Sequence, residues 1–596
     1  MVMLKIIKGN IRYIQNAFHQ SKLYTSLIVI LNVLVSSMPA VKVLVIGKLI
    51  DDASKWGELG AQLIVTDACR VLLIYILEYG LASIQSYLNY KFFVQLNNKM
   101  EDRFFSRLSK IKYAVLEDND CNDLIYQVKD GIEKKFAEGF AKILEFIGFA
   151  VSVGSILFVV LTKSIWTGLV LIIVFLCLVP LYRKIGEDNY EAYAESNKEF
   201  RLAQNYRRIL SDREYANERE VFGYSAFFNQ KWKQRYESAI EKELRASRSN
   251  HFKILVVTAG VTVLTTLLSG ILLSTLLDGS LTIGVYVVIV TQLYNLVHFM
   301  SWNFSYIVDE LAENQLYLAD YDAFLELDIV KQEEMEKKKL IGKIRICIEN
   351  LFFKYPGCEE YVLKDFSYEF IEGKHYAIVG KNGAGKTTLV KLLLGLYDDY
   401  EGRILINDID IREFSKTELK EIFSTVFQDY AKYAMTVKEN ILFEQTGDRV
   451  KEDQVKEVLK QLNVFEEIQE LKKGMDTTLG KIEEDGVDFS GGQWQKIAIA
   501  RGAVSDACVY ILDEPSSSLD PISEKHLYEL YNQIFETKTT ILITHRLGNT
   551  KEQDEILVLE DGCLVEYGHH RMLMEKKSVY YDMYQKQRSW YHEEEN

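Results

Sequence analysis

The hydrophobic and polar positions of this chain predict membrane-spanning helices in its first half. A helix needs about 20 apolar residues to cross a bilayer. Six apolar blocks reach that length, at about 23–47, 63–90, 143–161, 165–182, 254–277 and 283–306. The second block is the least regular, because Asp67, Arg70 and Glu78 interrupt it. The alternative, core helices of a large soluble protein, is disfavoured by the uncharged run IWTGLVLIIVFLCLVP from residue 165.

Lys and Arg residues are distributed unevenly between the connections of these blocks. The short connections hold only Lys55 and Lys163, whereas the long stretches 91–142 and 183–253 are rich in both residue types. Basic residues accumulate on the cytoplasmic side, so both termini are predicted to be cytoplasmic. Segment 4–22 mixes Lys and Arg with apolar positions, which indicates an amphipathic helix on anionic membrane lipids. We therefore predict a multi-pass protein of the plasma (inner) membrane.

Composition and charge indicate where one domain ends and the next begins. The long stretches between blocks contain hardly any Gly or Pro, so we expect helices that continue well beyond the bilayer. The charged segment KQEEMEKKK suggests a membrane domain at 1–330, a linker at 331–343 and a second domain at 344–596. An aromatic content of 12% excludes a disordered chain. The net charge of −15 argues against nucleic acid as a partner.

The second half alternates short β-rich runs with helical stretches, a pattern typical of α/β domains. The apolar run HYAIV is followed by GKNGAGKT and then by a helical run. Such a loop surrounds phosphate oxygens with backbone N–H groups at the start of a helix. The expected nucleotide contacts are Gly380, Lys381, Asn382, Gly383, Ala384, Gly385, Lys386, Thr387 and Thr388. Lys386 is predicted to reach the β- and γ-phosphates, and the Thr387 hydroxyl to bind Mg²⁺.

A further apolar run, CVYIL, ends in the adjacent carboxylates Asp513 and Glu514. Many buried strands end in Asp, so the pair alone is a weak signal. After a phosphate-binding loop it becomes specific, because nucleotide hydrolysis needs a metal ligand and a group that orients water. We predict that Asp513 holds Mg²⁺ through water and that Glu514 polarises the attacking water. ATP and Mg²⁺ are the expected cofactors.

Between these elements lies FSGGQ at 489–493, and with this motif the chain resembles the ABC transporters. The pentapeptide matches the LSGGQ signature of that family, with Phe at the Leu position. Other family elements occur in the family's order: the adenine-stacking aromatic Tyr355, the Q-loop Gln428, the D-loop Ser518, Leu519 and Asp520, and the switch His545. The resemblance gives His545 a catalytic role and Gln428 a place in the Mg²⁺ site. Because stacking uses only the ring face, Tyr355→Phe is expected to be nearly silent.

The resemblance covers the whole chain and implies an exporter half-transporter. The implied fold is an all-α polytopic membrane domain, with six transmembrane helices and long cytoplasmic extensions, followed by an α/β P-loop ABC ATPase domain. A second copy, or a homologous half-transporter, would complete a dimer. Each ATP would be enclosed by the signature of the other subunit, at Ser490, Gly491, Gly492 and Gln493. Two short cytoplasmic helices near 113–124 and 215–228 would transmit closure to the spans.

The implied function is ATP-driven export of an amphipathic substrate, which could be a peptide, a lipid or a drug. A non-exporting membrane ABC protein, such as an importer on the same scaffold or an ATP-gated sensor, would share every motif named above. The six spans argue against a soluble mechanical ATPase. Trp494 and Gln495, directly after the signature, resemble exporters of ribosomal peptides such as lantibiotics. No leader-cleaving protease domain is expected in this chain.

Polar positions within the spans are the candidates for substrate contact. On the sixth span, Asn295, His298 and Trp302 share one helical face, and we predict that this face lines the transport cavity. A stripe of Thr and Ser on the fifth span favours helix packing. Glu78 is either a counter-ion for a cationic substrate or a partner of Arg70 or Lys42.

Overall fold

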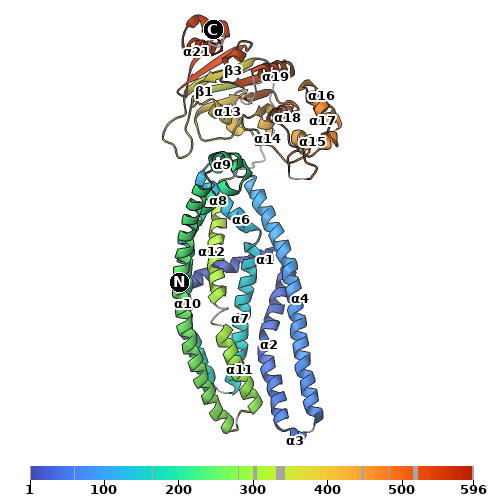
Figure 1. The fold of residues 1–596 in the computed structure, drawn as a ribbon, viewed down its shortest axis with the longest axis vertical. Helices are drawn as coiled ribbons and strands as arrows, with labels where there is room; N and C mark the ends of the chain where they lie inside the picture. Colours follow the sequence, from blue (N-terminus) through green and yellow to red (C-terminus); the bar gives the residue numbers. More distant parts are fainter. Residues whose placement is uncertain are drawn as a thin grey trace. The chain divides into compact units, whose positions relative to one another are not determined.

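The computed structural model divides into two compact units, the first at 1–111 and 119–329 and the second at 112–118 and 330–596. The structure describes residues 2–592 except for 60, 164, 280, 300–304, 331–337, 339–342, 444–448, 482–483 and 515–520. Each unit contains a core of its own, helical in the first unit and built around β-sheets in the second (Figure 1).

The first unit is built from helices, several of which run alongside one another over long distances (Figure 1). Its elements are α1 (Val2–Gln20), α2 (Lys22–Ser54), α3 (Trp56–Leu59), α4 (Ala61–Leu108), α6 (Asn119–Ile132), α7 (Lys135–Lys163), α8 (Ile165–Ser211), η1 (Arg213–Tyr215), α9 (Ala216–Phe222), α10 (Ser225–Leu277), α11 (Ile283–Phe299) and α12 (Ser305–Glu326). The described parts of all six predicted blocks lie on these helices. With 53 residues, α10 is about 80 Å long, which exceeds the hydrocarbon core of about 30 Å more than twofold.

Among the residues of this unit that the structure describes, three helices meet a length and hydropathy criterion for spanning a membrane. They are Lys22–Ser54, residues 135–162 of α7, and Ser225–Leu277. The sixth block begins with a shorter apolar helix, Ile283–Asn295, and the second block lies on α4 with its three charged residues. Length and composition therefore support three of the six predicted spans, and the other three stay predictions.

Helix α1, which carries the basic residues of segment 4–22, packs against the other helices of this unit. Tyr13 is fully buried and donates a hydrogen bond to the Asn314 carbonyl oxygen over 2.9 Å. Its neighbour Arg12 forms an ion pair with Asp322 on α12. Figure 1 shows α1 lying across the long helices. Arg12, a basic residue of the segment predicted to lie on membrane lipids, is therefore paired within the protein. Helix α1 thus packs against other helices of its unit.

The intramembrane carboxylate Glu78 has a partner within the bundle. The Lys42 ammonium of α2 lies 2.5 Å from the Glu78 carboxylate of α4 and 4.6 Å from the centre of the Tyr75 ring. Both charged side chains are largely buried. An ion pair that also contacts a ring face offsets part of the cost of burying charge. Of the two interpretations of Glu78, the structure confirms pairing with Lys42.

The second unit contains two sheets. A four-stranded antiparallel sheet has the order β2-β1-β4-β5, from β1 (Arg345–Phe353), β2 (Leu363–Ile371), β4 (Glu401–Ile406) and β5 (Ile409–Asp410). A six-stranded sheet has the order β10-β9-β3-β8-β7-β6, from β3 (His375–Gly380), β6 (Phe423–Val426), β7 (Val509–Asp513), β8 (Thr539–Ile543), β9 (Glu555–Glu560) and β10 (Cys563–Gly568). From β9 to β6 the neighbouring strands are parallel. All residues of β7 and β8 are buried, as expected for strands covered on both faces.

Helices pack on these sheets and form two large apolar cores. The helices are α13 (Lys386–Leu393), α14 (Lys416–Ile422), α15 (Val437–Leu442), α16 (Arg449–Gln461), α17 (Phe465–Gln469), α18 (Gly491–Ala503), α19 (Pro521–Ile534), α20 (His570–Lys576) and α21 (Val579–His592), with short 3₁₀ turns η3 (Ile411–Glu413), η4 (Gly474–Asp476) and η5 (Leu547–Thr550). One core joins α13 to both sheets, and the other joins α15, α16 and α18 to the opposite side of the six-stranded sheet. The cores hold the strand ends that carry the chemistry in fixed relative positions.

Short helices occur in both predicted coupling regions. The first contains α5 (Tyr113–Leu116), and the second contains η1 and α9. Segment Lys112–Asp118 belongs by its contacts to the second unit. There the Glu117 carboxylate accepts a hydrogen bond from Lys391 over 2.6 Å, and Lys112 pairs with Asp398 over 2.7 Å. The predicted role of these helices in transmitting closure stays a prediction.

Candidate active site

Strand order brings the predicted site residues of the second unit to one edge of the six-stranded sheet. Strands β3, β8, β7 and β6 are parallel neighbours, so their carboxyl ends meet. In open α/β sheets, ligands bind outside these ends. The phosphate-binding loop follows β3, Glu514 follows β7, His545 follows β8 and Gln428 follows β6. Four segments that are far apart in the sequence therefore face one cavity.

The loop after β3 has the backbone that its glycines allow. Gly383 and Gly385 have φ angles of 81° and 95°, in the left-handed region that favours glycine. Helix α13 then begins at Lys386, with its N-terminus toward the loop. The Lys386 ammonium is buried and donates to the carbonyl oxygens of Gly380 and Lys381, each over 3.0 Å. Burial also lowers the Lys386 pKa. A bound phosphate would give this buried ammonium a partner of opposite charge.

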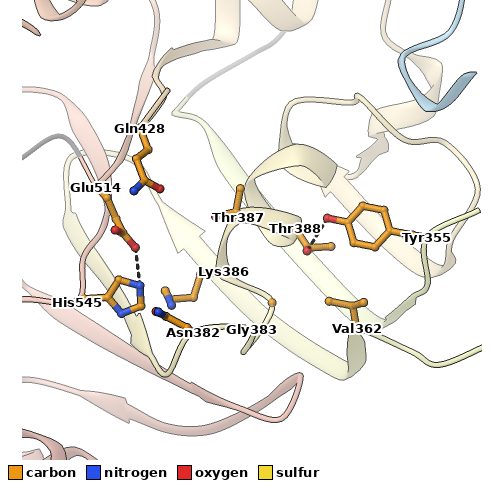
Figure 2. A pocket seen from close by; sticks show the side chains of 11 residues that line it. Tyr355, Val362, Asn382, Gly383, Lys386, Thr387, Thr388, Gln428, Glu514 and His545 are labelled. Atoms are coloured by element: carbon orange, nitrogen blue, oxygen red, sulfur yellow. Dashed lines mark hydrogen bonds and ion pairs between the residues drawn. The ribbon is translucent and has the colours of Figure 1, made fainter. Parts of the chain in front are cut away.

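The cavity at this edge has a volume of about 510 Å³, within the range of small-molecule sites. Figure 2 shows the side chains around it. Its lining consists of Tyr355, Val362, Asn382, Gly383, Gly385, Lys386, Thr387, Thr388, Gln428, Glu514 and His545. Val362 was not predicted, since a lone Val between β1 and β2 gives no sequence signal. Ala384 is buried and the Lys381 ammonium pairs with Glu560 over 2.8 Å, so these two loop positions contribute backbone rather than side chains.

Asp513 is a buried carboxylate with unused hydrogen-bonding capacity. Its side chain interacts with the Thr387 hydroxyl, while its Oδ1 has no hydrogen-bond partner among the described residues. Burial, together with the nearby Glu514 charge, raises the Asp513 pKa to about 6. An unsatisfied carboxylate oxygen beside a hydroxyl fits the oxygen ligands that Mg²⁺ prefers. Asp513, Thr387 and Gln428 therefore fit a divalent cation chemically.

Glu514 and His545 form a close pair beside Lys386. Their side chains approach within 2.5 Å, from Nε2 of His545 to Oε1 of Glu514 (Figure 2). Burial raises the pKa of Glu514 and lowers that of His545. The two shifts oppose formation of a fully charged pair and favour sharing of one proton. Glu514 has a φ of 45°, a left-handed conformation that costs energy outside glycine and is found at functional sites.

Tyr355 reaches the cavity from the segment after β1, and its hydroxyl has a specific partner. The Tyr355 and Thr388 hydroxyl oxygens are 2.9 Å apart (Figure 2). The ring contacts Phe353 and Tyr397 at centroid distances of 5.2 and 5.6 Å. The hydroxyl therefore helps to set the ring orientation. This differs from the expectation that only the ring face matters, because sequence does not show that Thr388 lies within reach.

We expect Tyr355→Phe to weaken ATP binding severalfold, since a hydrogen bond contributes about 0.5–1.5 kcal/mol. Tyr355→Ala should weaken it more, because stacking on a base contributes about 1–3 kcal/mol. Titration with a fluorescent ATP analogue measures both effects. Thr388→Val is the matched variant: its effect should not add to that of Tyr355→Phe, because both remove the same bond. Wild-type affinity for Tyr355→Phe would show that the hydroxyl is irrelevant.

The signature segment does not line the cavity of its own chain. Ser490 is the N-cap of α18, and its hydroxyl and the Gln493 side chain form a reciprocal capping box. The Gln493 amide also donates to Glu467 over 2.6 Å. Gly491 and Gly492 form the first turn of α18. These groups are exposed or partly exposed at a helix N-terminus, a position that favours phosphate binding. Because they do not line the cavity of their own chain, a phosphate bound there would come from outside that cavity.

The remaining predicted positions are only partly described. The D-loop match at 518–520 lies outside the described residues. Asn295 on α11 is exposed, while the His298 side chain and all of Trp302 lie outside the described residues. On the fifth predicted span, the Thr262 and Ser269 hydroxyls donate to carbonyl oxygens one turn earlier, and Ser269 is buried. That arrangement supports helix packing for the Thr and Ser stripe.

Comparison with known proteins connects this geometry to a family. The family model for the ABC transporter domain matches residues 363–517, which include the phosphate-binding loop, the signature and both carboxylates. The chain carries an ABC transporter domain. The ATPase activity predicted from the motifs is confirmed by this domain and by its homologues. ATP binding follows from the same domain.

The chain is also similar to proteins of comparable length. It is 28% identical to the subtilin transport ATP-binding protein of Bacillus subtilis, over 84% of this chain and 82% of that protein. It is 26% identical to the nisin transport ATP-binding protein of Lactococcus lactis subsp. lactis, over 95% and 94%. The ATP-dependent lipid A-core flippase of Escherichia coli K12 is 35% identical, over 43% of this chain and 44% of the flippase.

The fold is that of an ABC exporter. A bacterial Atm1-family ABC exporter with ATP bound superposes with a TM-score of 0.76 at 23% identity, over 94% of this chain and 97% of the other. The predicted fold class, a helical membrane domain followed by an α/β ABC ATPase domain, is confirmed. This fold and the similarity to the transport proteins named above fit the exporter half-transporter that the motifs predict. The apolar helices and this fold indicate an integral membrane protein.

Proposed function

We propose that this ABC transporter exports an amphipathic peptide from the cytoplasm as a dimer of two half-transporters. Support for a peptide comes from the subtilin and nisin transport proteins, which match across both units of the chain. The lipid A-core flippases match over 43% of the chain, a length close to that of the ATPase half alone. Their similarity therefore supports ATP use by the second unit and says less about the transported substrate. The proposed location is the plasma (inner) membrane, with both termini cytoplasmic.

In the proposed reaction each residue of the cavity has one role. Lys386 and the backbone of the loop hold the β- and γ-phosphates, and Tyr355 stacks on adenine. Glu514 orients the attacking water and accepts its proton, while His545 holds the Glu514 carboxylate in place. Thr387, Asp513 and Gln428 would hold Mg²⁺, which neutralises charge on the phosphates when bound. The observation that carries this assignment is the 2.5 Å contact between Glu514 and His545 beside Lys386.

Proteoliposomes test the direction of transport. The purified chain is reconstituted, and ATP with a fluorescently labelled amphipathic peptide is added outside. Molecules whose ATPase units face outward should accumulate peptide inside the vesicles. Glu514→Gln is the control, because it is expected to retain the fold and to lose hydrolysis. Peptide loss from preloaded vesicles under the same conditions would indicate an importer, and ATP turnover without peptide movement would contradict the proposed cargo.

The polar face of the sixth span is expected to contact the cargo. An unsatisfied polar group in hydrocarbon costs several kcal/mol, so Asn295, His298 and Trp302 should face protein or water. Single cysteines at these positions should react with a water-soluble thiol reagent without nucleotide, and ATP should protect them. His298→Ala or Trp302→Ala should change peptide-stimulated ATPase while basal turnover stays within about twofold. Three unreactive cysteines in both states would indicate helix packing instead.

A further inference from the structure

The C-terminal helix α21 is anchored firmly to the sheet that carries the cavity. Tyr580 in its first turn is fully buried, and its hydroxyl lies 2.9 Å from the Thr550 hydroxyl and 2.8 Å from Nδ1 of His570. The Tyr580 N–H donates to the Glu566 carboxylate over 2.9 Å. Tyr580 also packs in an apolar cluster with residues of β3 and β9. The helix therefore has a fixed position relative to the strand that precedes the phosphate-binding loop.

Two turns after Tyr580, one side chain of α21 contacts the segment that carries His545. The Gln587 amide nitrogen donates to the His545 carbonyl oxygen over 2.8 Å. The Gln587 amide oxygen accepts from the Leu547 N–H over 2.6 Å. A carbonyl can only accept and a backbone N–H can only donate, so these partners fix the orientation of the amide. Gln587 thereby holds the backbone on both sides of Arg546, directly after β8.

This contact matters because His545 has little tolerance for displacement. Its ring is 2.5 Å from Glu514 and also bonds to the Gly380 backbone. Beyond β8, which ends at Ile543, this backbone is held by the Thr544 N–H bond to the Ile378 carbonyl oxygen over 3.3 Å and by the two bonds to Gln587. A displacement of about 1 Å in a catalytic constellation can cost about 10²-fold in rate. Gln587 supplies two of the hydrogen bonds that oppose such a displacement.

We propose that Gln587 is a positioning residue for His545, so that helix α21 takes part in setting the rate of ATP hydrolysis. This rests on the proposed role of His545 in the reaction. Gln587 lies outside the segment matched by the family model, and α21 carries none of the motifs described above. It acts through the backbone of His545 and has no place in the lining of the cavity.

The test uses the full-length chain in proteoliposomes and compares kcat with ATP affinity. Gln587→Ala should lower kcat about tenfold, because His545 loses its backbone support. Affinity for a non-hydrolysable ATP analogue should stay within about twofold, because Gln587 does not line the cavity. Gln587→Glu keeps an acceptor for Leu547 but places a carboxylate oxygen against the His545 carbonyl, so kcat should fall at least as far. Gln585→Ala, on the same helix, is the matched control and should retain wild-type kcat.

A double-mutant cycle separates positioning from general stabilisation. If Gln587 acts through His545, then on a His545→Ala background Gln587→Ala should change the residual turnover less than about twofold. The thermal unfolding midpoint of Gln587→Ala should fall below that of Gln585→Ala by a few degrees at most, as expected for two lost hydrogen bonds. The proposal is overturned if Gln587→Ala retains wild-type kcat, or if it lowers turnover equally with and without His545. Wild-type turnover of His545→Ala itself would instead refute the proposed role of His545, and that variant is measured separately.

Discussion

Glu514→Gln is expected to bind ATP with nearly unchanged affinity and to hydrolyse it about 10²–10⁴ times more slowly, the range for a lost general base. The side chain approaches His545 within 2.5 Å at the edge where Lys386 would hold the terminal phosphate. Glutamine keeps the volume and can still bond to His545, but it cannot accept a proton from water. Phosphate release under single-turnover conditions measures the loss directly.

The control for this variant is Glu575→Gln, which makes the same chemical change at an exposed position of α20. It should retain wild-type turnover. Glu514→Gln should also trap bound ATP, so the dimer should stay closed and protect the nucleotide from exchange. Turnover of Glu514→Gln within about tenfold of wild type would assign the proton acceptor to another group, because loss of a general base costs more than that.

Mixing two inactive chains is expected to restore ATP hydrolysis. Lys386→Ala removes the ammonium that lies against the loop carbonyls, and Ser490→Arg blocks the N-terminus of α18. Each variant alone damages both sites of a homodimer. In a mixed dimer, one site carries both lesions and the other carries neither. Random pairing of equal amounts should give about half mixed dimers, hence about a quarter of the wild-type turnover.

The capping role of Ser490 requires its own control, since loss of an N-cap costs about 1 kcal/mol. Ser415 caps α14 with the same kind of reciprocal box, so Ser415→Arg reports loss of a cap alone. It should retain turnover in the homodimer, while Ser490→Arg should not. Occluded nucleotide is measured with turnover, and one nucleotide per mixed dimer is expected. Wild-type turnover by either single variant, or no occlusion in the mixture, would contradict a shared site.

Most of the second unit was predictable because its chemistry lies in short contiguous segments. A phosphate-binding loop is one strand, one turn and one helix, so GKNGAGKT specifies its own geometry at Gly383 and Gly385. The signature was equally local, as Ser490 and Gln493 cap their own helix. The membrane half was predictable more coarsely, since apolar length indicates a span but not its neighbours.

The membrane half shows where a single sequence stopped being informative. Glu78 had two open interpretations, because charge alone does not identify a partner on another helix. Packing of α2 against α4 brings Lys42 to it. Segment 4–22 was predicted from its amphipathic pattern as a lipid-facing helix. The pattern could not show that Tyr13 is buried against α12, since burial depends on which helix lies opposite.

By itself, the sequence determined the chemical class of the site and the helical character of the first half, because each rests on contiguous segments of the chain. Tertiary structure alone decided which side chains meet: Glu514 with His545, Tyr355 with Thr388, and Gln587 with the backbone of His545. These partners are separated by tens of residues. Their contacts depend on strand order and helix packing, which local pattern and propensity do not encode.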